Sequence, residues 1–154
     1  EFLTQHESHY LTELHELFMQ KVIRPQMRPE GFKAIQRHRE AGHALVGITA
    51  TSDFITAPIF REFGITEIIA TNAEIVDGKY TGKVINTACY QKGKLIRLEQ
   101  WLEGRDVTES WAYSDSINDR FLLEHADHAI AVNPDDRLET LAQEQGWEIQ
   151  DWSI

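Results

Sequence analysis

Short apolar runs alternate with amphipathic segments over most of the chain. Residues 44–48 are apolar at nearly every position, which is typical of a strand buried on both faces. Strands that alternate with helices form βαβ units, in which right-handed crossovers join parallel strands. The predicted fold class is therefore α/β, a three-layer Rossmann-like core with a mostly parallel sheet and one β-hairpin.

Turn and cap residues predict where individual helices end and where a hairpin turns. Gly42 predicts a left-handed cap at the end of a helix over residues 30–41. Asp77-Gly78 predicts a type I′ turn in a hairpin within residues 67–85. The remaining expected elements are helices carrying residues 95–102, 121–123 and 138–142, and strands at 111–114, 129–132 and 147–149, the last at an edge.

One further helix follows the strand at residues 44–48. Thr51 or Ser52 is its expected cap, and the helix is expected to reach residues 63–64. Pro58 lacks a backbone donor, so it predicts a kink or a late start near Thr56.

The 154 residues have the size of one domain and contain no repeat or flexible linker. Pro25 and Pro29 mark a seam, that is, a predicted boundary between two segments of the chain. Before it, apolar residues at helical spacing predict an amphipathic helix, and after it the α/β pattern begins. We therefore divide the chain into residues 1–26 and 27–154.

The charge of the chain excludes several partners. There are 25 acidic and 15 basic residues, a net charge of -10, and no dense basic run, which argues against nucleic acids and anionic membranes. The longest apolar run is too short for a membrane helix. The single Cys89 forms no internal disulfide, which indicates a reducing cytoplasm.

Ligands of open α/β sheets bind beyond the carboxyl ends of the strands. Asp115 follows one predicted strand and Asp119 comes four residues later. Two carboxylates without supporting Cys or paired His favour Mg²⁺ over zinc. The alternative is that both simply cap the next helix.

Two residues are candidate phosphate ligands. The Thr49 hydroxyl, with the N–H groups that follow it from Ala50 on, predicts an anion site at a helix N-terminus, although a plain strand-to-helix turn has the same sequence. Lys94 opens a helix, where a cation is electrostatically unfavourable unless an anion holds it. Its alternative is an ordinary solvated lysine.

The other reactive residue types carry less information. The pairs His6/His9 and His125/His128 lack a third metal ligand. Cys89 has no neighbouring base in the sequence, so an unreactive thiol is expected, and the four tryptophans are interpreted as packing residues.

Three segments, in this order, resemble the haloacid dehalogenase superfamily, specifically its phosphoserine-phosphatase-like branch. Residues 47–59 resemble its second motif, with Thr49 as the phosphate-contacting hydroxyl. Residues 93–98 resemble the third, with Lys94 as its lysine and Lys92 as a rival, and residues 113–119 resemble the fourth, which supplies acidic metal ligands. Ser52 departs from the asparagine of close relatives.

The first motif of that family, Asp-x-Asp-x-Thr, occurs nowhere in the chain. It supplies the aspartate nucleophile and the general acid/base. The resemblance thus implies that residues 1–26 end a helical cap, that residues 27–154 are a core without its first strand, and that the missing N-terminal segment of the same protein completes both. A sheet lacking that strand has two unpaired edges.

The resemblance implies a cytoplasmic, Mg²⁺-dependent phosphatase of a small phosphorylated metabolite. The implied supporting residues are Thr49, Ala50, Lys94 and Asn118 for phosphate, and Asp115 and Asp119 for Mg²⁺. A phosphotransferase using the same aspartyl-phosphate and a non-catalytic anion-binding or interaction domain remain the alternatives.

Overall fold

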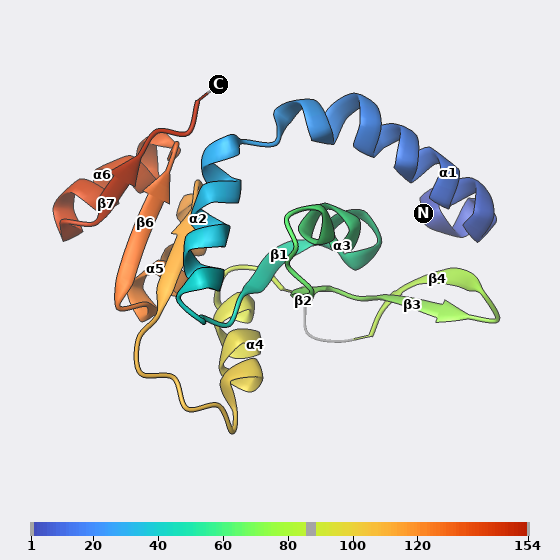
Figure 1. Ribbon diagram of the computed structural model, residues 1–154. Helices are drawn as coiled ribbons and strands as arrows, with labels where there is room; N and C mark the ends of the chain where they lie inside the picture. The colour runs from blue at the N-terminus through green and yellow to red at the C-terminus, as the bar shows by residue number, and fades with distance from the viewer. Residues whose placement is uncertain (1, 86–88, 154) are drawn as a thin grey trace. The chain divides into compact units, whose positions relative to one another are not determined.

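The computed structural model describes residues 2–85 and 89–153, which are coloured along the chain in Figure 1. They form two compact units, Glu1–Cys89 and Tyr90–Ile154, each described by itself. The first unit spans both sides of the seam at Pro25 and Pro29, so the division at residue 26 stays a prediction.

The first unit begins with helices and continues with two pairs of strands. Its elements are η1 (Phe2–Gln5), α1 (Ser8–Phe18), η2 (Met19–Ile23), η3 (Arg24–Gln26), α2 (Pro29–Glu40), β1 (Val46–Ser52), α3 (Asp53–Glu62), β2 (Glu67–Thr71), β3 (Ala73–Val76) and β4 (Lys79–Val84).

The helices of residues 2–26 are amphipathic, as predicted. Leu11 and Met19 are fully buried, whereas Tyr10, Leu14 and Leu17 form an exposed apolar stripe along α1. The guanidinium of Arg24 donates to Glu16 and to Glu62 at 2.9 Å, which fixes this segment to α3.

Strands β1 and β2 run parallel, and helix α3 connects them. Gly47 lets α3 pack closely on β1, because a Cβ at this position would lie 2.5 Å from the Phe60 ring. The pairing register shifts between Ile48 and Ser52, so residues 49–51 form a bulge between these two paired positions.

The expected late start of α3 is wrong. The helix begins at Asp53 and continues to Glu62 with Pro58 inside it. The Ser52 hydroxyl and the Asp53 carboxylate both accept the Phe54 N–H, at 3.3 and 2.9 Å, and these bonds fix the first turn ahead of the proline.

The local turn predictions are confirmed. Helix α2 ends in Ala41 and a left-handed Gly42, with φ of 79°. Asp77 and Gly78 have φ of 49° and 76°, and they connect β3 to the antiparallel β4.

The second unit contains α4 (Lys92–Leu102), β5 (Trp111–Ser114), η4 (Ile117–Asp119), α5 (Arg120–His125), β6 (His128–Val132), α6 (Asp136–Gln145) and β7 (Glu148–Gln150). Strands β5, β6 and β7 are parallel, with β7 at an edge as predicted. The buried core residues are Leu123, Ala129, Ala131, Leu138 and Ala142.

The fold is α/β with mostly parallel strands, which confirms the predicted class. Within the described residues, β1 pairs with β2 alone and β5 pairs with β6 alone. No helix in this part of the chain has the length and apolar character needed to cross a membrane.

Candidate functional site

Thr49 and Ala50 lie inside β1 rather than after it, because the strand continues to Ser52. The expectation that Thr49 sits at a helix N-terminus is therefore wrong, since α3 begins four residues later. The Thr49 hydroxyl accepts the Thr51 N–H at 3.2 Å, and both residues belong to the bulge. A bulge turns strand groups out of the ladder, so this segment still presents a hydroxyl and backbone groups at the carboxyl end of β1.

Thr71 anchors this segment, and the sequence analysis did not identify it. Its hydroxyl donates to the Ala50 carbonyl oxygen at 2.8 Å. Asp53 has a similar structural role, because its carboxylate accepts the Asn72 side-chain amide at 2.9 Å. Both contacts join the ends of β1 and β2, and the signal for them was that parallel strands end at one edge of a sheet.

Lys94 is buried and ion-paired. Its ammonium donates to Asp119 Oδ1 at 2.5 Å, and the Ser114 hydroxyl donates to Asp119 Oδ2 at 2.8 Å. The alternative of a solvated lysine is thus wrong, and the anion that holds Lys94 near the helix start is Asp119. The described contacts use one of the three ammonium donors.

Lys92, the rival lysine, is exposed, with Nζ 5.5 Å from the centre of the Phe121 ring. It therefore lies outside the Lys94–Asp119–Ser114 network.

Asp115 and Asp119 do not act as helix caps. Asp119 precedes α5 but makes no side-chain cap bond, and the residue that caps η4 is Ser116. The Asp115 carboxylate is exposed and has no hydrogen bond or ion pair with the residues that the structure describes. The main chain of Asp115 is fixed, because its carbonyl oxygen accepts the Asp135 N–H at 2.8 Å.

Asp135 holds the loop that carries these acids. Its carboxylate accepts the N–H of Ile117 at 2.9 Å and those of Leu138 and Arg137 at the start of α6, at 2.9 and 3.1 Å. These hydrogen bonds stabilise the ionised carboxylate, and the bond from Ile117 has the largest effect. They therefore hold the pKa of Asp135 below its usual value. The sequence analysis did not predict this role of Asp135, because it depends on a contact between separate loops.

Asn118 is exposed at the same loop. Its amide oxygen accepts the Tyr90 hydroxyl at 3.4 Å, and its amide nitrogen donates to Ser116 Oγ at 3.3 Å. Lys94, Asp115, Asn118 and Asp119 therefore gather around the carboxyl end of β5 within one unit. The structure describes Thr49 and Ala50 in the other unit.

The donors near β5 fit Mg²⁺ in their chemistry. Mg²⁺ is usually bound by one or two carboxylates together with waters and substrate phosphates. Asp115 offers an exposed carboxylate held by a fixed main chain, and Asp119 lies four residues away. Among residues 2–85 and 89–153, no three His, Cys, Asp or Glu side chains cluster as a complete metal site.

The predicted minor roles agree with the structure. Cys89 is fully buried, with Sγ 3.8 Å from the Ile69 carbonyl oxygen. Trp111 stacks on His128, whose Nε2 lies 2.7 Å from a Glu109 carboxylate oxygen, and Trp147 packs against the core of its unit.

Residues 1–124 match the family of haloacid dehalogenase-like hydrolases. The match covers most of the chain, and the protein belongs to this family. This membership confirms the resemblance on which the three motif segments were interpreted.

Two named relatives and one solved structure are similar to most of this chain. It is 40% identical over 153 residues to a histidinol-phosphatase of Neisseria meningitidis, covering 96% of this chain and 69% of the relative. It is 41% identical over 121 residues to phosphoserine phosphatase SerB1 of Mycobacterium tuberculosis, covering 77% of this chain and 39% of the relative. A solved structure of a protein of unknown function from Bordetella pertussis Tohama I superposes with a TM-score of 0.93 at 40% identity, over 98% of this chain and 70% of that one.

Proposed function

We propose that this protein is a Mg²⁺-dependent phosphatase that releases phosphate from a small phosphorylated metabolite in the cytoplasm. The observation that carries the proposal is the buried Lys94–Asp119 pair, braced by Ser114 and placed beside the exposed Asp115. Family membership and the phosphatase names of the relatives support it. These relatives are named for different substrates, so similarity to them does not decide which substrate this protein uses.

Each candidate site residue has a proposed role in binding phosphate or Mg²⁺. Lys94 has two ammonium donors beyond its bond to Asp119, and these would bind phosphate oxygens and offset their charge. The family resemblance also implies that the Thr49 hydroxyl, the Ala50 N–H and the Asn118 amide contribute to phosphate binding. Asp115 and Asp119 would hold Mg²⁺, which supplies Lewis-acid stabilisation of the phosphoryl oxygens when bound.

The attacking residue is proposed to lie in an N-terminal segment of the protein outside residues 1–154. An aspartate there would take the phosphoryl group from the monoester, the P–O bond to the alcohol would break and the alcohol would leave with a proton, and water would then hydrolyse the aspartyl-phosphate to phosphate and the free aspartate.

The test is phosphate release by the full-length protein. We expect EDTA to abolish turnover and Mg²⁺ to restore it. Lys94→Ala and Asp115→Asn should each lower kcat at least about 100-fold, because each removes a charge that acts on the reacting group. Lys92→Ala is the matched control and should keep normal turnover.

Normal turnover in Lys94→Ala and Asp115→Asn would overturn these roles. Transfer of the phosphoryl group to an added alcohol in place of water would identify a phosphotransferase.

A further inference from the structure

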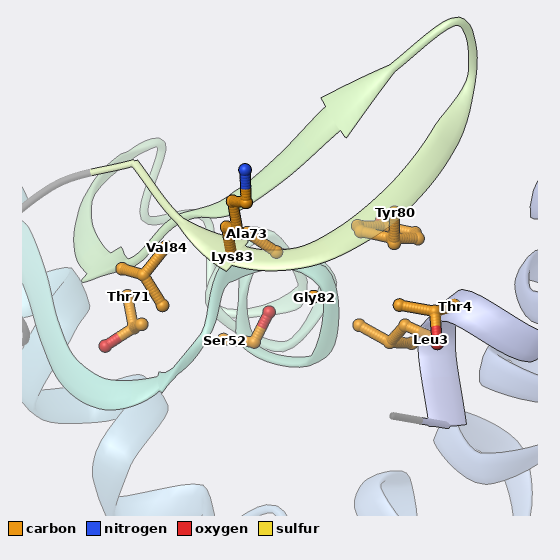
Figure 2. Close-up of a pocket in the computed structure, with 9 residues that line it drawn as sticks. All are labelled: Leu3, Thr4, Ser52, Thr71, Ala73, Tyr80, Gly82, Lys83 and Val84. Carbon is orange, nitrogen blue, oxygen red and sulfur yellow. The ribbon is translucent and has the colours of Figure 1, made fainter.

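A cavity of about 290 Å³ lies beneath the β3–β4 hairpin (Figure 2). Ser52 and Thr71, the last residues of β1 and β2, form one side of it. Tyr80 and Val84 of β4 form the opposite side, and Leu3 of η1 lies at one end. All of these residues belong to the first unit.

The cavity adjoins the candidate phosphate segment. Thr71, which lines the cavity, donates directly to the Ala50 carbonyl oxygen at 2.8 Å. Ser52, which also lines the cavity, follows Thr49 by three residues across the bulge of β1. A group esterified to a phosphate held at Thr49 and Ala50 would therefore reach the cavity.

No charged side chain among the described lining residues points toward Ser52 and Thr71. The described residues that line it include no acid, and its one cation, Lys83, directs its amino group away from Ser52 and Thr71 in Figure 2. The Ser52 hydroxyl already bonds to Asp53 and Phe54. Burial and the nearby Asp53 charge raise the pKa of Tyr80, so its phenol is neutral.

The size of the cavity suits a small ring. An apolar cavity of about 150 Å³ is large enough to bind benzene. The space under the hairpin exceeds this volume, and it is open at the surface to residues such as Val84, which is 51% exposed.

We propose that this cavity receives the alcohol part of the substrate and selects an uncharged, mainly apolar group of about the size of a ring. A zwitterionic alcohol part such as that of phosphoserine would lose its hydration there without gaining an ionic partner. This inference rests on the proposed phosphatase activity and specifies its substrate class.

The test compares three substrates of the full-length protein: 2-phenylethyl phosphate, ethyl phosphate and phosphoserine. We expect kcat/KM for 2-phenylethyl phosphate to exceed the other two values at least about tenfold, as filling an apolar pocket typically does. Val84→Trp narrows the cavity and should remove about tenfold of this advantage, while ethyl phosphate, whose alcohol part is small enough to fit the narrowed cavity, keeps its rate.

Val76→Trp is the matched control, because Val76 is equally exposed on the same hairpin but does not line the cavity. It should leave all three substrates unchanged. Preference for phosphoserine, or an equal effect of Val84→Trp on ethyl and phenylethyl phosphates, would overturn the inference while leaving the phosphatase activity in place. Failure to hydrolyse any phosphomonoester would instead overturn the proposed function.

Discussion

Lys94 and Asp119 have side chains that are 10% and 16% exposed. At such burial, attraction between the charges offsets the cost of removing both from water, and loss of one partner leaves the other uncompensated. The pair therefore has a structural role as well as its proposed role in phosphate binding.

These two roles can be separated with a double variant. Lys94→Met should lower the free energy of unfolding by about 3 kcal/mol, because the Asp119 charge stays buried without a cation and keeps only its hydrogen bond from Ser114. Adding Asp119→Leu should recover much of that stability without restoring phosphate release. Urea denaturation of the full-length protein measures the first effect and phosphate release the second.

Lys92→Met is the control for stability, with an expected change within about 0.5 kcal/mol for an exposed side chain. If Lys94→Met were as stable as the control, the ion pair would contribute nothing to folding.

At the scale of single elements, signals within a few residues of the chain predicted most of the structure. Gly42 and Asp77-Gly78 were informative because a positive φ is a local property. Strand β5 was predicted to the residue. The start of α3 was not, because the bonds of Ser52 and Asp53 to Phe54 outweighed the effect expected from Pro58.

Candidate site residues were predictable by type, and their supporting contacts were not. Lys94 was recognisable as a cation at the wrong end of a helix, but its burial against Asp119 depends on the tertiary fold. Thr71 and Asp135 act through partners 21 and 18 residues away, on Ala50 and Ile117, which no local pattern shows.

The start of α6 provides a prediction about pH. Asp135→Ala should lower the free energy of unfolding by about 1 kcal/mol at pH 7, because the carboxylate caps the helix. Its pKa is lowered in the folded state, so this contribution is fully present above the ordinary aspartate pKa of about 3.9 and disappears as the pH falls through the lower folded value.

Urea denaturation at several pH values measures the difference between wild type and variant, which should be constant from neutral pH to about pH 5 and shrink below about pH 4. Asp136→Ala, next in the chain, is the control and should have the smaller effect. A difference that grows on acidification would contradict the assignment.

At the scale of the whole molecule, β1 and β5 each have one open edge among the described strands, at the opposite end of their sheets from the edge strands β2 and β7. Open edges carry unpaired N–H groups that another strand can bind. We expect an N-terminal segment of the protein to supply that strand.

Hydrogen exchange tests this expectation. Amides of β1 and β5 should exchange more slowly in the full-length protein than in residues 1–154 alone. Strand β6 is the internal control, because β5 and β7 flank it, and its amides should be protected in both samples. Equal exchange of β1 in the two samples would show that no strand is added there.

The residues proposed to bind phosphate and those proposed to bind the alcohol lie in different segments of the sequence. Residues that would hold phosphate lie in the bulge of β1, whereas Tyr80 and Val84 lie in β4, beyond α3 and β2. Recognition of the alcohol and chemistry at phosphorus are thus encoded in different stretches of the chain. Substitutions in the hairpin, or a change in its length at the Asp77-Gly78 turn, would redirect the enzyme to other alcohols without disturbing the phosphate segment. Homologues with one fold would then diverge in substrate more readily than in reaction.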